Sequence, residues 1–322
     1  MQFVKEFLSL FNISVKSTLK TCAFLFKIMI PVSILLKILQ STGWIIYVGQ
    51  AFAPLMKPLG LPGEMGLVWA TSLLGNIFGG ILVLLSSLST IQLSIAQMSV
   101  LTFLSLIAHT LIIETAITYK IGIKIIPMVL FRLLIAFAGG MILNFIYSSF
   151  GILQEPAKIL MPHPTSPENT FWQWIFNELQ RYATMVFFIF GLIFLLEILK
   201  KLDLIKYINK VFAPFVNAMG VSVKIIPMTI IGITLGLAYG GALIIKESRE
   251  NEFSAKDIFY AMFLMAIFHS MIEDSLLMLS VGGHYSSILL FRTLFAFIIM
   301  FCIVRFTKNR NDAWIKKYFF RR

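Results

Sequence analysis

The chain repeats itself at a fixed offset of 160 residues, so any fold for it must accommodate two related halves. The stretches Tyr47–Pro54 and Tyr207–Pro214 read YVGQAFAP and YINKVFAP. The halves also share ionisable residues inside apolar stretches: His109 with His269, Glu114 with Asp274, and Arg132 with Arg292. Such residues are costly in a lipid-facing helix, and their repetition indicates a membrane protein with a site between its halves.

Composition settles the class of protein. Of the 322 residues, 58% are hydrophobic and only 13% are charged, which leaves too little polar surface to enclose a soluble core of this size. The sequence therefore predicts an all-α polytopic membrane protein. Met1–Lys20 lacks the features of a cleavable signal peptide, so the first apolar run is expected to stay in the membrane. Cys22 and Cys302 lie far apart in apolar stretches and are expected to be packing residues.

A net charge of +12 is also typical of nucleic-acid-binding proteins, but here the basic residues flank apolar segments as the positive-inside rule requires. They precede the first apolar run and crowd the C-terminal tail: Lys5, Lys16, Lys20, Arg305, Lys308, Arg310, Lys316, Lys317, Arg321 and Arg322. We therefore expect no nucleic-acid partner. The expected surroundings are the lipid bilayer of a bacterial-type cytoplasmic (inner) membrane, with both termini cytoplasmic.

Long apolar segments follow one another along the chain, at residues 18–39, 65–88, 92–117, 124–148, 181–199, 224–246, 256–281 and 286–306. One interpretation is eight straight transmembrane helices in two parallel repeats. With the C-terminus inside, that interpretation places the basic loop 200–224 outside the cell, against the positive-inside rule.

A second interpretation makes two of these segments re-entrant hairpins, each entering and leaving the membrane on the same side. Glycines lie at their centres, in Gly75–Gly80 and Gly236–Gly241, where a helical hairpin needs positive φ or close backbone approach. Each arm of about a dozen residues is roughly 18 Å long, enough to reach the middle of a ~30 Å hydrocarbon core. A single helix with a glycine packing face is the alternative for each segment.

With the hairpins in place, each half has three crossings, and an odd number inverts the second half relative to the first. The predicted organisation is a first repeat with its N-terminal flank at 1–148, an extracytoplasmic Pro-rich linker at 149–180, a second repeat at 181–306 and a basic cytoplasmic tail at 307–322. The loop 40–64 and the turn 282–284 would share the side of the linker.

Short interfacial helices are predicted before each hairpin. Residues 204–219 have apolar positions at helical spacing opposite lysines and asparagines, and residues 44–57 carry Trp44 and Tyr47, residue types favoured at the membrane interface. In the linker, four prolines exclude a regular helix through the middle, and His163 between two of them is predicted to be an exposed loop residue.

The two histidines are the central candidates for a site. His109 lies about 16 Å along a helix from the cytoplasmic Lys120, near mid-depth, and His269 reaches a similar depth in the other half. Imidazole titrates near neutral pH, which suits proton coupling or hydrogen bonding to a substrate. Glu273 follows His269 by four residues, so the two are expected to share a helix face.

The repeated carboxylates and arginines are predicted to pair between adjacent helices. Glu114 would pair with Arg132, and Asp274 with Arg292. Two structural ion pairs and a relay for protons or cations both remain open as interpretations.

A metal site is the alternative use of the same residues. His109 and Glu114 from one half, with His269 and Asp274 from the other, form a ligand set acceptable to Zn²⁺ or Fe²⁺. His109 and Glu114 are about 140° apart around an ideal helix, so only a broken helix would turn both toward one ion. No resident cofactor is otherwise expected.

The predicted hairpin tips supply further substrate-binding candidates, because broken helices present free backbone groups at the midplane. These candidates are Thr71, Gly75 and Asn76 in the first hairpin, and Thr234, Gly236, Tyr239 and Gly240 in the second. The structural alternative is glycine packing, with Asn76 capping a helix end.

The order of elements resembles the Gate, or "nucleoside recognition", family. That order is a crossing helix, an interfacial helix ending in Phe-Ala-Pro, a glycine-tipped hairpin, a histidine-bearing helix and a final helix, twice over residues 18–305. The family is related to the core of concentrative nucleoside transporters, and similar repeats form the membrane part of ferrous-iron transporters and of spore-maturation membrane proteins. The resemblance implies an inverted-repeat carrier whose hairpins and neighbouring helices enclose a polar solute.

These observations predict a secondary transporter of a small polar, nucleoside-like solute, coupled to protons or another ion, with its site at the midplane between the repeats. Transport or binding of a divalent metal is the first alternative, and a non-transporting membrane partner of another complex is the second. The absence of a Walker loop, a nucleophile elbow and an HExxH motif argues against an enzyme. The sequence leaves a homo-oligomer open.

Overall fold

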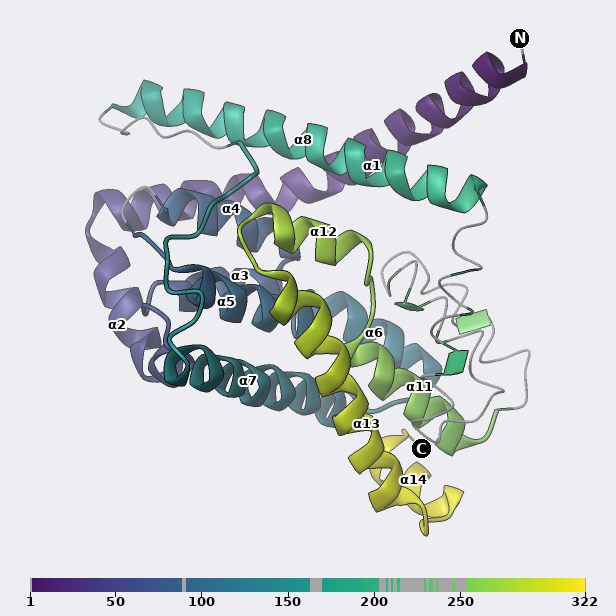
Figure 1. Cartoon of the computed structure of the whole chain (residues 1–322). Coiled ribbons are helices and arrows are strands. Elements are labelled where there is room, and N and C mark those ends of the chain that lie inside the picture. Colours follow the sequence, from purple (N-terminus) through teal and green to yellow (C-terminus); the bar gives the residue numbers. More distant parts are fainter. Residues whose placement is uncertain are drawn as a thin grey trace.

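The structure is a computed structural model of the whole chain. It describes residues 2–88, 91–162, 170–202 and 253–321, with a few isolated positions between 203 and 252. The described helices are α1 (Gln2–Ser41), α2 (Trp44–Met56), α3 (Met65–Leu74), α4 (Ile77–Ser87), α5 (Ile95–Ile107), α6 (Leu111–Ile121), α7 (Ile125–Ser149), α8 (Phe171–Lys201), α11 (Ala255–Ile267), α12 (Glu273–Ser280), α13 (Arg292–Thr307) and α14 (Asp312–Phe319) (Figure 1).

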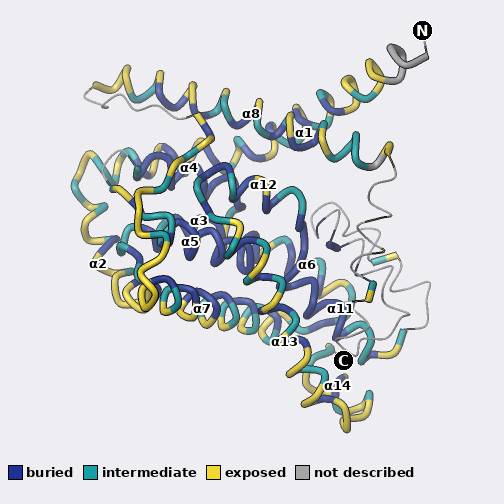
Figure 2. The backbone as a smooth tube through the Cα atoms, in the orientation of Figure 1, coloured by how far each residue is buried: buried dark blue, intermediate teal, exposed yellow. Residues whose placement is uncertain are grey.

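The predicted all-α polytopic membrane class is confirmed. Five stretches of the described chain are long and apolar enough to cross a membrane: Phe7–Ser41, Ile95–Ile121, Ile125–Ser149, Phe171–Leu199 and Ser286–Thr307. Burial is greatest along the central helices α4, α5 and α11, while α1, α7 and α8 expose many positions (Figure 2). Large apolar side chains on these outer helices, such as Phe145 and Phe187, are exposed and suit contact with lipid.

The helices α1 and α8 lie side by side along one edge of the molecule (Figure 1). Phe11 on α1 packs against Phe190 on α8 with ring centroids 5.4 Å apart, and Ser33 farther along α1 donates to Glu178, earlier in α8, at 2.9 Å. Residues later in α1 contact residues earlier in α8, so the two helices are antiparallel. Most of α1 corresponds to α8 at the 160-residue offset.

The segment 65–88 folds back on itself, as the hairpin prediction requires. α3 ends at Leu74, and α4 begins at Ile77 with Asn76 as its N-cap. A Cβ built on Gly80 would lie 1.8 Å from the Ser72 hydroxyl, so the two arms touch closely. The segment before α3 and the helix after α4 also meet, because the side-chain amide of Gln97 donates to the Gly60 carbonyl at 2.9 Å. Most of the second predicted hairpin, 224–246, lies outside the described residues.

Two segments that were predicted to be continuous helices are broken. The segment 92–117 forms α5 and α6 with a break at Ala108–Thr110, and the segment 256–281 forms α11 and α12 with a break after Ile267. Thr110 and Ser270, 160 residues apart, both adopt left-handed backbone with φ of 48° and 47°. The interpretation as eight straight helices is therefore wrong for these segments and for 65–88.

Contacts between the halves occur in exchanged pairs. Phe103 packs on Phe291 with centroids 5.3 Å apart, and their 160-residue counterparts, Phe263 and Phe131, pack at 4.5 Å. Where residue i of one half contacts residue j of the other and the reverse also holds, the two halves are related as in a two-fold interface. The segment 286–306 departs from this regularity, since it starts as a π-helical turn, Ser286–Phe291, before α13.

Hydrogen bonds group the connecting segments at two ends of the bundle. At one end the Lys124 amide donates to the Phe319 carbonyl at 2.8 Å, and the Lys256 ammonium donates to the Lys308 carbonyl at 3.0 Å. At the other end the Ala157 amide donates to the Leu93 carbonyl at 2.9 Å, and the Leu160 amide donates to the Ser280 carbonyl at 2.9 Å. The tail and the 120–124 loop thus share one end, and the linker and the 282–284 turn share the other.

The linker is shorter than predicted. α8 begins at Phe171, so its first ten residues lie in the segment predicted to be linker, before residue 181. The last proline of the linker is Pro167, and the sequence FWQWIFNELQRY that follows it has an amphipathic helical pattern. Residues 151–162 are irregular, in keeping with their prolines. The predicted helix at 44–57 is present as α2, whereas His163 and most of 204–219 lie outside the described residues.

Glycine is required where α3 crosses α2, and this provides a stability test. A Cβ on Gly66 would lie 2.4 Å from the Cβ of Phe52, an atom that moves only with its backbone, whereas a Cβ on Gly191 in α8 has nothing within 4 Å. We expect Gly66→Ala to lower the melting temperature in detergent, reflecting overpacking that typically costs about 1–3 kcal/mol. The matched control Gly191→Ala should be neutral or slightly stabilising, because alanine has the higher helix propensity. Equal melting temperatures for the two variants would contradict the α2–α3 packing.

Candidate functional site

The two helix breaks place His109 and His269 against each other at the centre of the molecule. Their ring centroids are 5.1 Å apart, and both side chains are buried. Each imidazole is oriented by a carbonyl of the preceding helix. The Nδ1 of His109 lies 2.7 Å from the Ser105 carbonyl, and the Nδ1 of His269 lies 2.7 Å from the Met265 carbonyl. A carbonyl only accepts hydrogen bonds, so Nδ1 is protonated in both rings. The Nε2 atom of each ring points away from its own helix, toward the space between the two halves.

Side chains satisfy the carbonyls that the break in α5 leaves free. The end of a helix exposes carbonyls that lack an intrahelical partner, and inside a membrane each needs a donor. Beyond Ser105, the Leu106 carbonyl accepts from Arg292 at 3.4 Å, the Ile107 carbonyl from Arg132 at 3.0 Å, and the Ala108 carbonyl from the Trp69 indole at 3.2 Å. Donors from both halves therefore hold this break open.

The end of α11 repeats the arrangement. Arg292 donates through Nε to the Ile267 carbonyl at 2.9 Å, as Arg132 does to Ile107, and through a terminal nitrogen to the His269 carbonyl at 2.9 Å. Each break also bonds to the preceding segment, since the Thr110 amide donates to the Ser72 carbonyl at 2.8 Å and the Ser270 amide to the Gly232 carbonyl at 3.3 Å. A cation at a helix C-terminus also complements the helix dipole.

Carboxylates enter the cluster from the first turns of α6 and α12. The Oε1 of Glu114 lies 3.4 Å from Nε2 of His109 and 3.3 Å from Nε2 of His269. The Oδ2 of Asp274 lies 3.6 Å from Nε2 of His109. Both carboxylates are buried, at 3% and 6% exposure. At the 160-residue offset His109 corresponds to His269, and Glu114 corresponds to Asp274. The contacts His109–Asp274 and His269–Glu114 are therefore the same contact, made once from each half.

The predicted ion pairs form in one half only. Arg132 pairs with Oε2 of Glu114, which confirms the first pair. The second is wrong: no ion pair joins Asp274 and Arg292 among the described residues, because Arg292 donates to carbonyls of both breaks and Asp274 turns toward His109. Glu273 and His269 do not share a helix face either, since α11 ends at Ile267 and α12 begins at Glu273.

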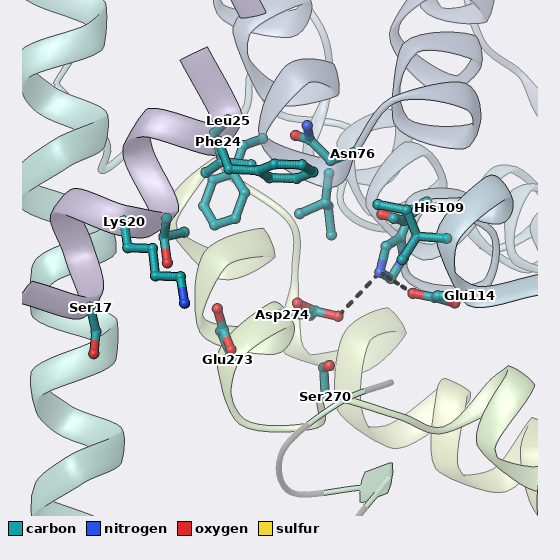
Figure 3. Close-up of a pocket in the computed structure, with 15 residues that line it drawn as sticks. Ser17, Lys20, Phe24, Leu25, Asn76, His109, Glu114, Ser270, Glu273 and Asp274 are labelled. Atoms are coloured by element: carbon teal, nitrogen blue, oxygen red, sulfur yellow. Dashed lines mark ion pairs between the residues drawn. The ribbon is translucent and has the colours of Figure 1, made fainter. Parts of the chain in front are cut away.

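A cavity of about 530 Å³ opens beside the cluster. Its lining includes His109, Glu114, Ser270, Glu273 and Asp274, with Thr110 and Asn76 from the first half and a stretch of α1 from Ser17 to Leu25 (Figure 3). In this view Lys20 of α1 extends into the cavity on the side where Glu273 lies, and Asn76 lies on the opposite side. Charged and neutral polar groups therefore converge on one space.

The hairpin-tip candidates divide into two groups. Asn76 lines the cavity, and its Oδ1 accepts from the Gly79 amide at 2.8 Å as a helix cap, while its buried Nδ2 has no hydrogen-bond partner. Gly75 and Thr71 belong to the hairpin turn and the contact between its arms, and neither is part of the cavity lining. In the second half, Gly236 has φ of 70° and packs against Ser270. Thr234, Tyr239 and Gly240 lie outside the described residues.

Several residues of the site were not predicted. Lys20 was assigned to the cytoplasmic flank, but it lies one turn before Phe24 on the face of α1 that lines the cavity. Ser270 and Thr110 are conspicuous only through their backbone conformation. The signal in the sequence was the adjacency of hydroxyl residues to both histidines, in His109-Thr110 and His269-Ser270.

The buried ion pair predicts a strong coupling between its members. Arg132→Met leaves the Glu114 charge and the Ile107 carbonyl without their donor, and breaking a buried pair typically costs about 3–5 kcal/mol. We expect a large fall in melting temperature, partly recovered in Arg132→Met with Glu114→Gln, since the double variant removes the unpaired charge. Arg305→Met, at an exposed position, should change little. A double variant no more stable than the single one would contradict the coupling.

Comparison with known proteins agrees with the resemblance in the sequence. Residues 23–129 match the family model Gate, described as nucleoside recognition. Over 296 residues the chain is 24% identical to the uncharacterized membrane protein YvoD of Bacillus subtilis (strain 168), a match that covers 90% of this chain and 93% of YvoD. No solved structure matches the chain. The matched region contains His109 and Glu114, and the chain is similar to the Gate family over residues 23–129.

Proposed function

We propose that the protein is a secondary carrier of a small polar solute in a bacterial cytoplasmic membrane. The observation that carries the proposal is the cavity of about 530 Å³ whose polar lining comes from broken helices of both halves. Broken helices with free backbone groups and ionisable side chains are the way in which membrane carriers build a solute site within the bilayer.

The proposal includes an inverted arrangement of the two halves. A two-fold axis parallel to the membrane normal keeps equivalent spanning helices parallel, whereas an axis in the membrane plane makes them antiparallel. The antiparallel packing of α1 and α8 supports the second case. The hairpin α3–α4 starts and ends near the linker end of the bundle, which supports a re-entrant segment.

The solute that suits the cavity best is nucleoside-like. The volume lies in the range of ligand pockets for molecules of this size. Nδ2 of Asn76 is a buried donor without a hydrogen-bond partner, the hydroxyls of Thr110 and Ser270 donate or accept, and Lys20 and Glu273 supply charge at the α1 side. A sugar hydroxyl or base edge needs such groups. The cluster behind Asp274 provides the place for a coupling ion, so the carrier would be ion-coupled.

Ligand stabilisation of the purified protein tests the solute class. A ligand that binds only the folded state raises the melting temperature, by about 2.7 kcal/mol of unfolding free energy at 100 times its Kd. We expect uridine or adenosine to stabilise the protein in detergent, and Asn76→Ala to lose this shift because it removes the free amide. Asn12→Ala, the same change at an exposed position of α1, should retain it.

Uptake into proteoliposomes completes that test. The carrier proposal requires accumulation of the stabilising nucleoside that is lost in Asn76→Ala with the fold intact. Stabilisation by neither nucleosides nor nucleobases, with no uptake, would remove the organic-solute carrier. Metal transport and a non-transporting partner role would then be the remaining candidates.

Single cysteines test the topology. In a variant with Cys22 and Cys302 replaced by serine, we expect cysteines at Lys120 and Lys308 to react with an impermeant maleimide only after cell lysis. Cysteines at Leu160 and Tyr285, at the opposite end of the bundle, should react in intact cells. Labelling of Lys120 from outside would overturn the inverted arrangement, and so would labelling of all four positions from one side.

A further inference from the structure

We propose that His109, His269, Asp274 and Glu114 bind one divalent transition-metal ion of the Zn²⁺ or Fe²⁺ type. One ligand atom from each of His109, His269 and Asp274 can be chosen so that all lie within 4.8 Å of one another, and all three residues are buried. Glu114 adds a fourth donor, since its Oε1 is 3.4 Å and 3.3 Å from the two Nε2 atoms. Two ligands come from each half, and the inference does not require that the protein carries a solute.

The distances in the cluster match ligands of one ion better than hydrogen bonds. An N–H···O hydrogen bond joins atoms about 2.7–3.2 Å apart. The three Nε2–carboxylate distances are 3.3, 3.4 and 3.6 Å, longer than a typical hydrogen bond. Ligands bound at about 2.0–2.1 Å in a tetrahedral site lie roughly 3.3–3.4 Å from one another. Two of these three distances equal the spacing of ligands around a zinc-sized ion, and the His109–Asp274 distance is slightly longer.

The electronic arrangement also calls for a cation. Both imidazoles hold their proton on Nδ1 against a carbonyl, so each Nε2 presents a lone pair to carboxylate oxygens that are themselves acceptors. The Nε2 of His269 and the Oδ2 of Asp274 are buried without a hydrogen-bond partner. Acceptors facing one another in an apolar interior are unfavourable, and a metal ion among them would accept one lone pair from each donor atom.

The surrounding residues act as the outer shell that metal sites need. Metal-bound histidines commonly donate their other nitrogen to a carbonyl, which fixes the tautomer and the ring orientation, and ligating carboxylates are hydrogen-bonded in turn. Ser105 and Met265 provide the carbonyls, and Arg132 holds Oε2 of Glu114 so that Oε1 faces the histidines. The helix break removes the 140° separation that a continuous helix would place between His109 and Glu114.

The donor set selects the class of metal. Two imidazole nitrogens with two carboxylates suit Zn²⁺ or Fe²⁺, whereas Mg²⁺ and Ca²⁺ prefer oxygen ligands alone. Cysteine takes no part among the described residues, since Cys22 and Cys302 both lie outside the cluster. The cavity touches His109, Glu114 and Asp274, which gives an ion a path to the site.

Metal binding to the purified, untagged full chain tests the proposal. After treatment with a chelator and its removal, we expect titration with Zn²⁺ to give one ion per chain by calorimetry and by elemental analysis, with Mg²⁺ unable to compete. Co²⁺ should bind at the same stoichiometry with the strong visible absorption of a four-coordinate site. Zn²⁺ should also raise the melting temperature.

Three single variants, one double variant and a control make the test specific. His109→Ala, His269→Ala and the isosteric Asp274→Asn should each weaken Zn²⁺ binding by at least tenfold, and the double histidine variant should bind none. His284→Ala removes a histidine outside the cluster and should bind as the unmodified protein does. The Asp274→Asn variant guards against a failure of the histidine variants to fold, which size-exclusion chromatography and the metal-free melting temperature will reveal.

Several outcomes would overturn the metal site. These are no stoichiometric Zn²⁺ in the unmodified protein, unchanged binding in Asp274→Asn, loss of binding in His284→Ala, or an octahedral Co²⁺ spectrum. None of them bears on nucleoside stabilisation, which depends on Asn76. Failure of the carrier proposal and failure of the metal site are therefore separate results.

Discussion

Two buried arginines hold the centre of this protein together. Arg132 and Arg292 each donate through Nε to the last carbonyl of a half-helix, and without them the breaks in α5–α6 and α11–α12 would leave bare carbonyls in an apolar interior. The breaks in turn orient His109 and His269 and direct Glu114 and Asp274 inward. A break of this kind is stable only because its donors come from other helices, so the cluster and the packing of the halves depend on each other.

The sequence predicts much of this arrangement, and there is a clear physical reason why it does not predict the helix breaks beside the histidines. The 160-residue offset, the ionisable residues and the break near Asn76 all have local signatures, namely identical spacing, charge in apolar runs and glycine. The break at Ala108–Thr110 has none, since no glycine or proline is near it. It is stabilised by Trp69, Arg132 and Arg292, whose proximity is a product of the tertiary fold. A continuous helix there would separate Glu114 from His109, which is why the sequence offered the four-residue cluster only on the condition of a broken helix.

The same cause explains the mistaken second ion pair. Spacing alone made Asp274–Arg292 the image of Glu114–Arg132. In the structure Arg292 reaches the Leu106 carbonyl across the interface, a contact that the local sequence does not specify and that Arg132 does not mirror in the described residues. Duplicated halves constrain the backbone strongly, because packing must be compatible with both. They constrain side-chain partners weakly, because each half meets a different neighbour once sequences diverge.

The unequal treatment of the two carboxylates gives the cluster a direction. Glu114 is clamped by Arg132, whereas Oδ2 of Asp274 has no hydrogen-bond partner and Asp274 lines the cavity beside Glu273. One carboxylate of the cluster therefore has an arginine partner, and the other has none among the described residues. A centre built from two related halves is thus electrostatically unequal, with the less balanced carboxylate next to the cavity.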